Sequence, residues 1–180
     1  MVDVTWTCKC GAVEAKVPTK GNRIVCYCES CRAFVSKLDA KERLNAQGGS
    51  ELLQTKPQDV TITKGVEHLV HMHLTPKGPL RWYTRCCGTP MANTLTTRSL
   101  PFASFQVHDL EPKNNLPAFK GVVNLGGATG HVENAKRASV LALIASILGG
   151  AATAYLSGTV KKNPFFDPSG APIGPRQDPV

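Results

Sequence analysis

The chain has 180 residues, a hydrophobic fraction of 42%, a charged fraction of 19% and a formal net charge of +8. These values are typical of one globular domain with an extension, long enough to bury a core that a metal would reinforce rather than replace. The positive charge favours anionic partners. Lys and Arg are scattered instead of clustered with aromatic residues, however, so a small acidic ligand is favoured over nucleic acid.

The N-terminal segment, MVDVTWTCKCG, lacks a positively charged region followed by an apolar run. It therefore predicts no secretory signal and a reducing, cytoplasmic location. Residues 2–17 alternate loosely and are rich in β-forming residues, which indicates a hairpin that carries Cys8 and Cys10. Gly11 allows the turn of this hairpin to be tight.

The middle of the chain is predicted to be mainly β. Residues 23–28 form a short strand that runs into a cysteine-rich turn, and residues 32–45 are either one helix or an irregular connection. Four further strand-like runs follow, at residues 59–63, 67–74, 80–86 and 101–108. We place a domain boundary near Glu111, which gives a β-rich domain at residues 1–111.

Residues 112–180 are predicted to be an extension with a helix near residues 135–157 and a proline-rich tail. Residues 138–157 carry no charge over 20 positions and are flanked by basic residues, which fits the length of a bilayer span. Their content of Ala, Ser, Gly and Thr argues against a span and favours a packed helix, either buried or at a homo-oligomer interface. We expect Phe165 and Phe166 to anchor the tail by apolar burial.

The large side chains of this helix recur at helical spacing, which predicts that they form its packed face. They are Val140, Leu141, Ile144, Ile147, Leu148 and Tyr155.

Seven cysteines fall in three tight clusters, which indicates metal binding rather than a secreted disulfide scaffold. They are Cys8 and Cys10, then Cys26, Cys28 and Cys31, and finally Cys86 with Cys87. The spacings suit zinc, and two sites are expected. Cys8 and Cys10 need partners from far along the chain, most naturally Cys86 and Cys87, in a closed structural site.

Cys26, Cys28 and Cys31 supply three ligands within six residues, and a site with three protein ligands keeps one coordination position open for chemistry. A soft site of this kind suits a thiolate, with Arg32 or Lys37 compensating its negative charge. The alternatives are that a residue from elsewhere closes the site, or that the three thiols are free and reduced. Glu29 is the nearest carboxylate in sequence.

Two other features have simpler interpretations. His71 and His73 share a strand face and could bind a metal together, but polar positions on a half-buried strand explain them equally well. Trp82 and Tyr83 are expected to fill core and rim positions. The glycines of NLGGATGH are interpreted as a flexible turn, because no GK[ST] follows them.

The order CxCGAV, CxCxxC and an aromatic strand ending in CGTP resembles the glutathione-dependent formaldehyde-activating enzyme family, which also includes centromere protein V. The resemblance covers about residues 2–108. It implies a β-rich zinc fold, a structural zinc site and a second zinc, associated with catalysis, at Cys26, Cys28 and Cys31. Enzymes of that family are carbon-sulfur lyases or synthases that act on the glutathione adduct of formaldehyde.

The chain departs from the family pattern at the last cluster. The family's CxxCG would place cysteines at positions 84 and 87, whereas this chain has Thr84 and an additional Cys86. Adjacent cysteines reach one metal only with a strained backbone, so one hypothesis is that Cys86 points across the strand and closes the second site.

The leading functional hypothesis is a zinc-dependent, carbon-sulfur lyase-like protein that acts on or binds a small thiol or glutathione adduct. The alternatives are a non-catalytic, zinc-stabilised protein-binding module and a redox or metal sensor. An enzyme should show an open coordination position. A binding module should show four ligands at each zinc and an exposed apolar patch on the C-terminal helix.

Overall fold

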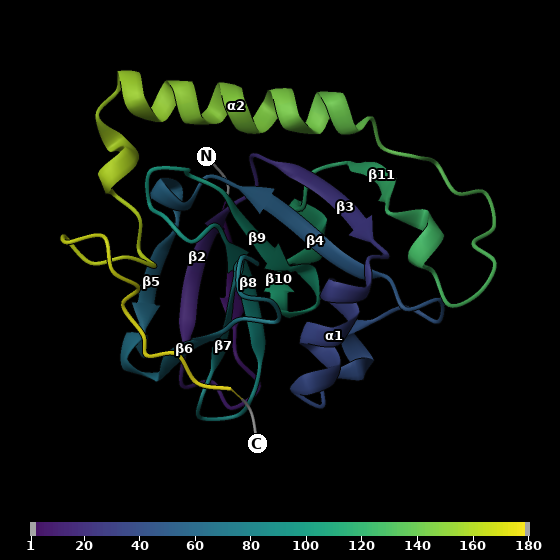
Figure 1. Cartoon of the computed structure of the whole chain (residues 1–180), viewed down its shortest axis with the longest axis horizontal. Helices are drawn as coiled ribbons and strands as arrows, with labels where there is room; N and C mark the ends of the chain where they lie inside the picture. The colour runs from purple at the N-terminus through teal and green to yellow at the C-terminus, as the bar shows by residue number, and fades with distance from the viewer. Residues whose placement is uncertain (1–2, 179–180) are drawn as a thin grey trace.

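The computed structural model in Figure 1 describes residues 3–178. Within that range the protein is mainly β, with strands in two sheets and two α-helices, of which one lies in the C-terminal part. The predicted fold class, a β-rich domain with a C-terminal helical extension, is confirmed.

The smaller sheet has four antiparallel strands in the order β10-β1-β2-β5. These strands are β1 (Asp3–Thr7), β2 (Glu14–Pro18), β5 (Thr61–Lys64) and β10 (Leu110–Glu111). β1 and β2 form the predicted cysteine-bearing hairpin; Val2, the first residue of the predicted segment, lies outside the described residues.

The larger sheet has seven strands in the order β11-β3-β4-β9-β8-β7-β6. These strands are β3 (Asn22–Cys26), β4 (Ser50–Thr55), β6 (Leu69–Met72), β7 (Leu80–Thr84), β8 (Pro90–Thr94), β9 (Ala103–Gln106) and β11 (Phe119–Val123). β11 pairs in parallel with β3, and the other neighbours are antiparallel. β11, which follows Glu111 in sequence, is thus the edge strand of the large sheet. Its neighbour β3 ends at Cys26, the first residue of the second cysteine cluster.

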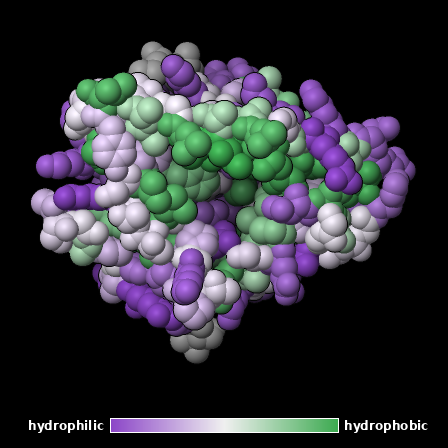
Figure 2. Space-filling view, turned by 45° about the horizontal axis from the view of Figure 1, so that its top comes forward, coloured by the Kyte–Doolittle hydropathy of each residue, from purple (hydrophilic) through white to green (hydrophobic). Residues whose placement is uncertain are grey.

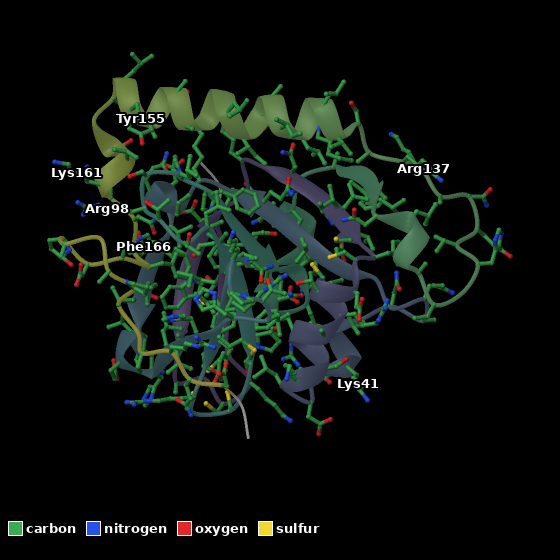
Figure 3. All side chains as sticks on the ribbon, in the orientation of Figure 1. Lys41, Arg98, Arg137, Tyr155, Lys161 and Phe166 are labelled. Carbon is green, nitrogen blue, oxygen red and sulfur yellow. The ribbon has the colours of Figure 1, made fainter. Side chains whose placement is uncertain are left out.

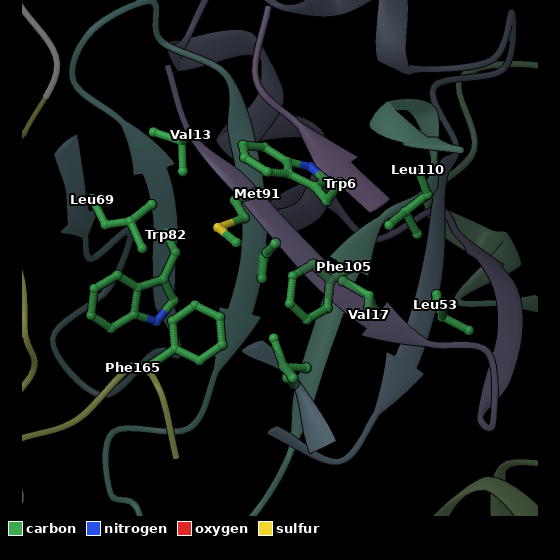
Figure 4. Close-up of a cluster of buried hydrophobic side chains, with 14 of the residues drawn as sticks. Trp6, Val13, Val17, Leu53, Leu69, Trp82, Met91, Phe105, Leu110 and Phe165 are labelled. Carbon is green, nitrogen blue, oxygen red and sulfur yellow. The ribbon is translucent and has the colours of Figure 1, made fainter. Parts of the chain in front are cut away.

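The main core lies between the two sheets (Figure 4). Trp6 from the small sheet and Trp82 and Phe105 from the large sheet are fully buried there. Phe165, from the C-terminal tail, packs its ring 5.1 Å from that of Trp82 and 6.1 Å from that of Phe105, measured between centroids. With Phe166 also buried, the prediction that these two residues anchor the tail is confirmed.

α1 (Glu29–Lys37) begins directly after the cysteine turn. The Cys28 sulfur accepts a hydrogen bond from the backbone N–H of Cys31 and so caps the helix. Residues 32–45 were predicted to be one helix or an irregular connection. The helix starts three residues earlier and ends at Lys37, shortly before Asp39 takes a φ of 50°.

α2 (Val140–Leu156) runs as a straight rod along one side of the molecule (Figure 1). The hydroxyl of Ser139 caps its N-terminus by accepting from the N–H of Ala142. Among the described residues, no helix combines the length and apolar character that a membrane crossing requires. The alternative that the large side chains of this helix are buried is wrong for most of them, because the helix turns Leu143, Gly150 and Ala154 to the body and leaves the larger side chains exposed. The alternative of a homo-oligomer interface stays a prediction.

Candidate metal centres

The first centre brings together four cysteines from two turns that are remote in sequence. Cys8 and Cys10 come from the β1–β2 turn, and Cys86 and Cys87 from the β7–β8 turn; all four sulfurs lie within 4.8 Å of one another. The Sγ atoms of Cys10 and Cys86 are 3.4 Å apart, although 76 residues separate them. The spacings from Cys8 to Cys10 and from Cys86 to Cys87 are 3.6 Å and 3.8 Å. These four sulfurs can hold one metal ion.

A glycine in the left-handed region follows each cysteine pair. Gly11 has a φ of 71° and Gly88 a φ of 66°, and both turns close by backbone hydrogen bonds, from Gly11 N to Cys8 O and from Gly88 N to Thr84 O. Glycine adopts this conformation without a steric penalty, so each turn can present its sulfurs to one point. The predicted role of Gly11 is confirmed.

Hydrogen-bond donors surround the sulfurs of the first centre. Val13 N donates to Cys8 Sγ at 3.2 Å, and the Thr84 and Thr89 hydroxyls lie 3.3 Å and 3.1 Å from Cys87 Sγ. Burial raises the pKa of Cys87, but hydrogen bonds from these hydroxyls and from Cys10 together outweigh it and lower the pKa to about 6. Thr84, which stands where the family pattern expects a cysteine, therefore supports the site as a hydrogen-bond partner of Cys87 rather than as a ligand.

The second centre contains Cys26 at the end of β3, Cys28 at the helix cap and Cys31 in α1. Their three sulfurs also lie within 4.8 Å of one another and can hold a metal ion. Cys26 and Cys31 are buried, and Cys28 is partly exposed. Contacts with the Cys26 and Cys31 thiols lower the pKa of Cys28. Contact with Cys28, together with burial, raises the pKa of Cys26, and contacts with Cys26 and Cys28 raise the pKa of Cys31. Full deprotonation of all three therefore requires a nearby cation.

Arg81 supplies one positive charge beside this centre. It projects from β7, is only 4% exposed, and places Nη1 3.9 Å from Cys31 Sγ. Its guanidinium also donates to Asn93 Oδ1 at 2.8 Å and to Ser30 Oγ at 2.5 Å. Within residues 3–178 no carboxylate forms an ion pair with Arg81, so its charge is turned toward the thiols rather than neutralised by an acid.

The turn after β11 covers the second centre from the side. Asn124 Nδ2 donates to Cys26 Sγ at 3.3 Å, and Arg32 Nη1 donates to the Gly127 carbonyl oxygen at 2.7 Å. A Cβ on Gly127 would collide with the Tyr27 carbonyl oxygen. Gly127 belongs to the segment that was interpreted as a flexible turn. Because it lacks a side chain, this turn can lie directly against the loop that carries the cysteines of the second centre.

An apolar cluster borders the same centre. Cys26 and Cys31 belong to one hydrophobic cluster with Ile24, Leu52 and Leu143 of α2. The apolar surroundings of these two cysteines strengthen electrostatic interactions at the site relative to water.

The hypothesis that Cys86 points toward the second centre is wrong. Its sulfur lies beside Cys10 in the first centre, and neither Cys86 nor Cys87 has a positive φ. The turn that ends in Gly88 lets both adjacent cysteines face the β1–β2 hairpin. Burial, together with contact with Cys10, raises the pKa of Cys86 to about 12.

The structure also changes the expected charge partners of the second centre. Arg32 is bonded to the Gly127 carbonyl, and Lys37 and Glu29 are exposed on α1. Sequence reasoning missed Arg81 and Asn124 because they lie 50 and 98 positions from their cysteine partners. The sequence contained one local signal for Arg81, which is the charged residue of the strand segment LRWYT. All five residues of this strand are buried.

The two histidines stay near each other without a third ligand. His71 is buried, and its ring centroid lies 5.8 Å from that of His73 and 5.1 Å from that of Trp82. Burial lowers the pKa of His71. The two cysteine centres are the metal-capable groups of three or more ligands found in the described part of the chain, and neither includes a histidine. Trp82 and Tyr83 are both buried, which places them in the core as expected.

Comparison with known proteins gives a family but no activity. The profile of a family of unknown function, DUF6151, matches residues 1–170. No curated protein matches the chain. A crystal structure of a Rhodobacter sphaeroides protein matches with 21% sequence identity and a TM-score of 0.45, and the match covers 64% of this chain and 96% of that one.

Proposed function

We propose a function from the two cysteine centres themselves, because the chain belongs to DUF6151, a family of unknown function. The protein is a zinc-dependent protein that binds a thiol at the second centre. It acts there as a carbon-sulfur lyase on thiol adducts of the glutathione type. The observation that carries the proposal is a cluster of three buried or half-buried thiols beside a buried arginine that has no acid partner among the described residues.

The choice of zinc rests on the donor sets. An all-sulfur site favours zinc over magnesium or calcium, which prefer oxygen ligands. Tetrahedral zinc with bonds of about 2.3 Å to sulfur separates its sulfurs by about 3.8 Å. The spacings of 3.4 Å to 3.8 Å in the first centre are close to that value. We assign a structural role to this zinc, because four cysteines complete its coordination.

The second centre differs in its charge balance. Three thiolates and one Zn²⁺ carry a net charge of about −1, which the adjacent Arg81 guanidinium brings to about zero. A fourth, anionic ligand is therefore tolerated better here than in a four-thiolate site. When bound, zinc would stabilise an incoming sulfur as its thiolate, and three protein ligands leave room for it.

The reaction class follows from what stabilises a thiolate. Cleavage of a hydroxymethyl thioether breaks its carbon-sulfur bond, leaves the electron pair on sulfur, and releases the hydroxyl proton as formaldehyde forms. The positive charge of Arg81 favours the sulfur anion, and the burial of Cys26 and Cys31 limits water at the site. The motif resemblance to the formaldehyde-activating enzyme family supports the same substrate class.

A second candidate function is favoured by a different observation. The outer face of α2 is apolar and exposed, as expected for a non-catalytic module that binds a partner. Three ligands rather than four at the second centre favour the enzyme. The two candidates therefore differ in whether the second centre accepts a thiol.

Metal stoichiometry on the purified protein tests the two sites. We expect two zinc ions in the wild type and one in Cys31→Ser, with the variant still folded. Cys87→Ser should lose the other zinc together with much of its thermal stability. A wild type without zinc would contradict both assignments.

A thermal-shift comparison tests the thiol. Glutathione should raise the melting temperature, since a ligand that binds only the folded state stabilises it, and S-methylglutathione should not, because its sulfur cannot become a thiolate. Cys31→Ser provides the matched control and should respond to neither compound. If neither compound shifts the wild type, the thiol proposal fails and the binding-module function is preferred.

A further inference from the structure

The outer face of α2 exposes large apolar side chains along the whole helix. Leu141 is 80% exposed, Leu148 62% and Leu156 91%. Val140, Ile144 and Tyr155 are about half exposed in the same helix. Figure 2 shows this surface as a hydrophobic band over α2. The band is a continuous apolar surface, whereas exposed apolar residues on a protein surface are normally scattered singly.

The helix lacks the polar outer face of an ordinary surface helix. Its 17 residues, VLALIASILGGAATAYL, include no charged side chain. A surface helix normally places charged or polar residues opposite its buried stripe. Here Ala145 and Ala152, together with the leucines, occupy the outward positions, and both alanines are exposed. The outer face is therefore suited to an apolar environment.

The body of the protein holds the helix in a defined orientation. Leu143 is buried near its N-terminus and Ala154 near its C-terminus. Asn22 donates to Ser146 Oγ at 3.3 Å, and Tyr155 Oη donates to the Ser99 carbonyl at 2.6 Å. Because these contacts lie on the inner side and at both ends, the apolar band is presented outward.

Positive charge lies at both ends of the band. Lys136 and Arg137 precede α2, and Lys161 and Lys162 follow it; all four are exposed. No Asp or Glu occurs between Glu133 and Asp167. Figure 3 shows Arg137 and Lys161 at opposite ends of α2, on the side of the helix nearer the protein body. An apolar strip with cations set back at both ends matches the order of acyl chains and anionic headgroups in a lipid leaflet.

The charge pattern disfavours a second copy of the chain as the occupant. If two α2 helices packed in parallel, each pair of cations would meet the same pair of the other copy. If they packed antiparallel, the pair at residues 136–137 would meet the pair at residues 161–162. Both arrangements bring like charges together without an acidic residue from the segment to compensate them.

We propose that α2 docks the protein on an anionic lipid surface, lying in the plane of the interface with Leu141, Leu148 and Leu156 among the headgroup and upper acyl regions. A 17-residue helix is about 25 Å long, shorter than the hydrocarbon core of about 30 Å, so it lies on the bilayer and does not cross it. The four flanking cations bind acidic headgroups. Leu143, on the inner side of the helix, belongs to the hydrophobic cluster that also contains Cys26 and Cys31, so the docked helix remains packed on the part of the body that carries the second centre.

Vesicle flotation tests the docking directly. At low salt the wild type should float with vesicles that contain phosphatidylglycerol and bind much more weakly to vesicles of phosphatidylcholine alone. Added salt should weaken binding, because it screens the cations. The double variant Leu141→Ser with Leu148→Ser should bind roughly tenfold more weakly for each leucine. Lys136→Gln with Arg137→Gln should lose roughly fivefold for each charge.

Matched controls separate docking from general surface effects. Val66→Ser removes a half-exposed apolar side chain before β6, and Lys77→Gln removes an exposed charge from the β6–β7 loop; both should bind as the wild type does. Unchanged circular dichroism and melting should show that the leucine variant is folded. A wild type that floats with neither kind of vesicle overturns the proposal. A wild-type dimer that the leucine variant converts to monomers, without vesicle binding, identifies a second copy as the occupant instead.

Discussion

At the scale of single residues, Arg81 is the side chain that distinguishes the second centre from a purely structural metal site. A buried guanidinium without a carboxylate partner is costly unless another anion compensates it. Cys31 Sγ lies 3.9 Å from Arg81 Nη1, and Asn93 and Ser30 hold the guanidinium in place. The arginine and the thiols therefore stabilise each other's charged states.

This pairing predicts the effect of replacing Arg81. In Arg81→Gln, zinc affinity at the second centre should fall by about 10- to 100-fold, the range found when a partner of metal ligands is removed. Competition with a chelating dye measures the loss, and the first centre, which Arg81 does not contact, serves as an internal reference. Arg81→Lys should recover part of the affinity.

Arg32→Gln is the matched control, because that guanidinium bonds to the Gly127 carbonyl and to no sulfur in the described structure. It should retain near-normal affinity. Equal affinities in the wild type and Arg81→Gln would show that Arg81 only fills space.

At the scale of elements, local sequence patterns predicted the strands that carry such patterns and missed the strands whose conformation depends on packing against distant segments. The β1–β2 hairpin and the strands around residues 23–28 and 80–86 carry alternation and turn signals of their own. β4 consists of SELLQT and β8 of PMANT; neither segment alternates strongly, and both lie inside the large sheet, where neighbouring strands determine their conformation. β11 contains Gly121 with a φ of 136° and a register shift, so it lacks a regular strand pattern.

The same limit applies to the cysteines. Clustering within three short segments identified all seven candidate ligands, because CxC and CxxC spacings act over a few residues. Which turn Cys86 faces depended on how β7 meets the β1–β2 hairpin, which no local pattern contains. Burial of the large side chains of α2 was predicted as one alternative, and it is wrong for a related reason: helical spacing shows that residues share a face, but not what covers it.

The C-terminal tail lies outside the predicted β domain in sequence, yet it contributes a side chain to the core of that domain. Phe165 lies against Trp82 and Phe105, so Phe165→Ala should lower the free energy of unfolding by about 3 to 5 kcal/mol. Urea unfolding measures this difference. Phe119, which is 41% exposed at the start of β11, is the control, and its alanine variant should cost less than about 1 kcal/mol. A small effect of Phe165→Ala would support a tail that is independent of residues 1–111.

At the scale of the whole molecule, the first centre joins the two sheets. One pair of its cysteines lies in the β1–β2 turn of the small sheet and the other in the β7–β8 turn of the large sheet. The core that these sheets enclose contains both tryptophans of the chain, Trp6 and Trp82, which are fully buried. A metal bound at this centre would therefore hold the two halves of the core together.

Removal of this metal should loosen the whole protein. Structural zinc contributes an apparent 10 to 16 kcal/mol in small zinc peptides, roughly the net stability of a domain. We expect Cys10→Ser to lower the melting temperature strongly and to shift tryptophan emission to longer wavelengths as water reaches Trp6 and Trp82. Cys28→Ser, which affects the other centre, should leave the emission unchanged. Identical spectra for Cys10→Ser and the wild type would contradict the role of this centre in holding the sheets.

The hydrogen bond from Asn124 to Cys26 spans 98 positions, and this has a consequence for synthesis on the ribosome. Chains grow at about 5 to 20 residues per second, so Cys26 leaves the ribosome about 5 to 20 s before Asn124 and β11. During that interval the three thiols of the second centre lack the turn after β11 that later lies against them. Capture of a metal ion by the growing chain would therefore protect these sulfurs from oxidation earlier than folding alone could do so.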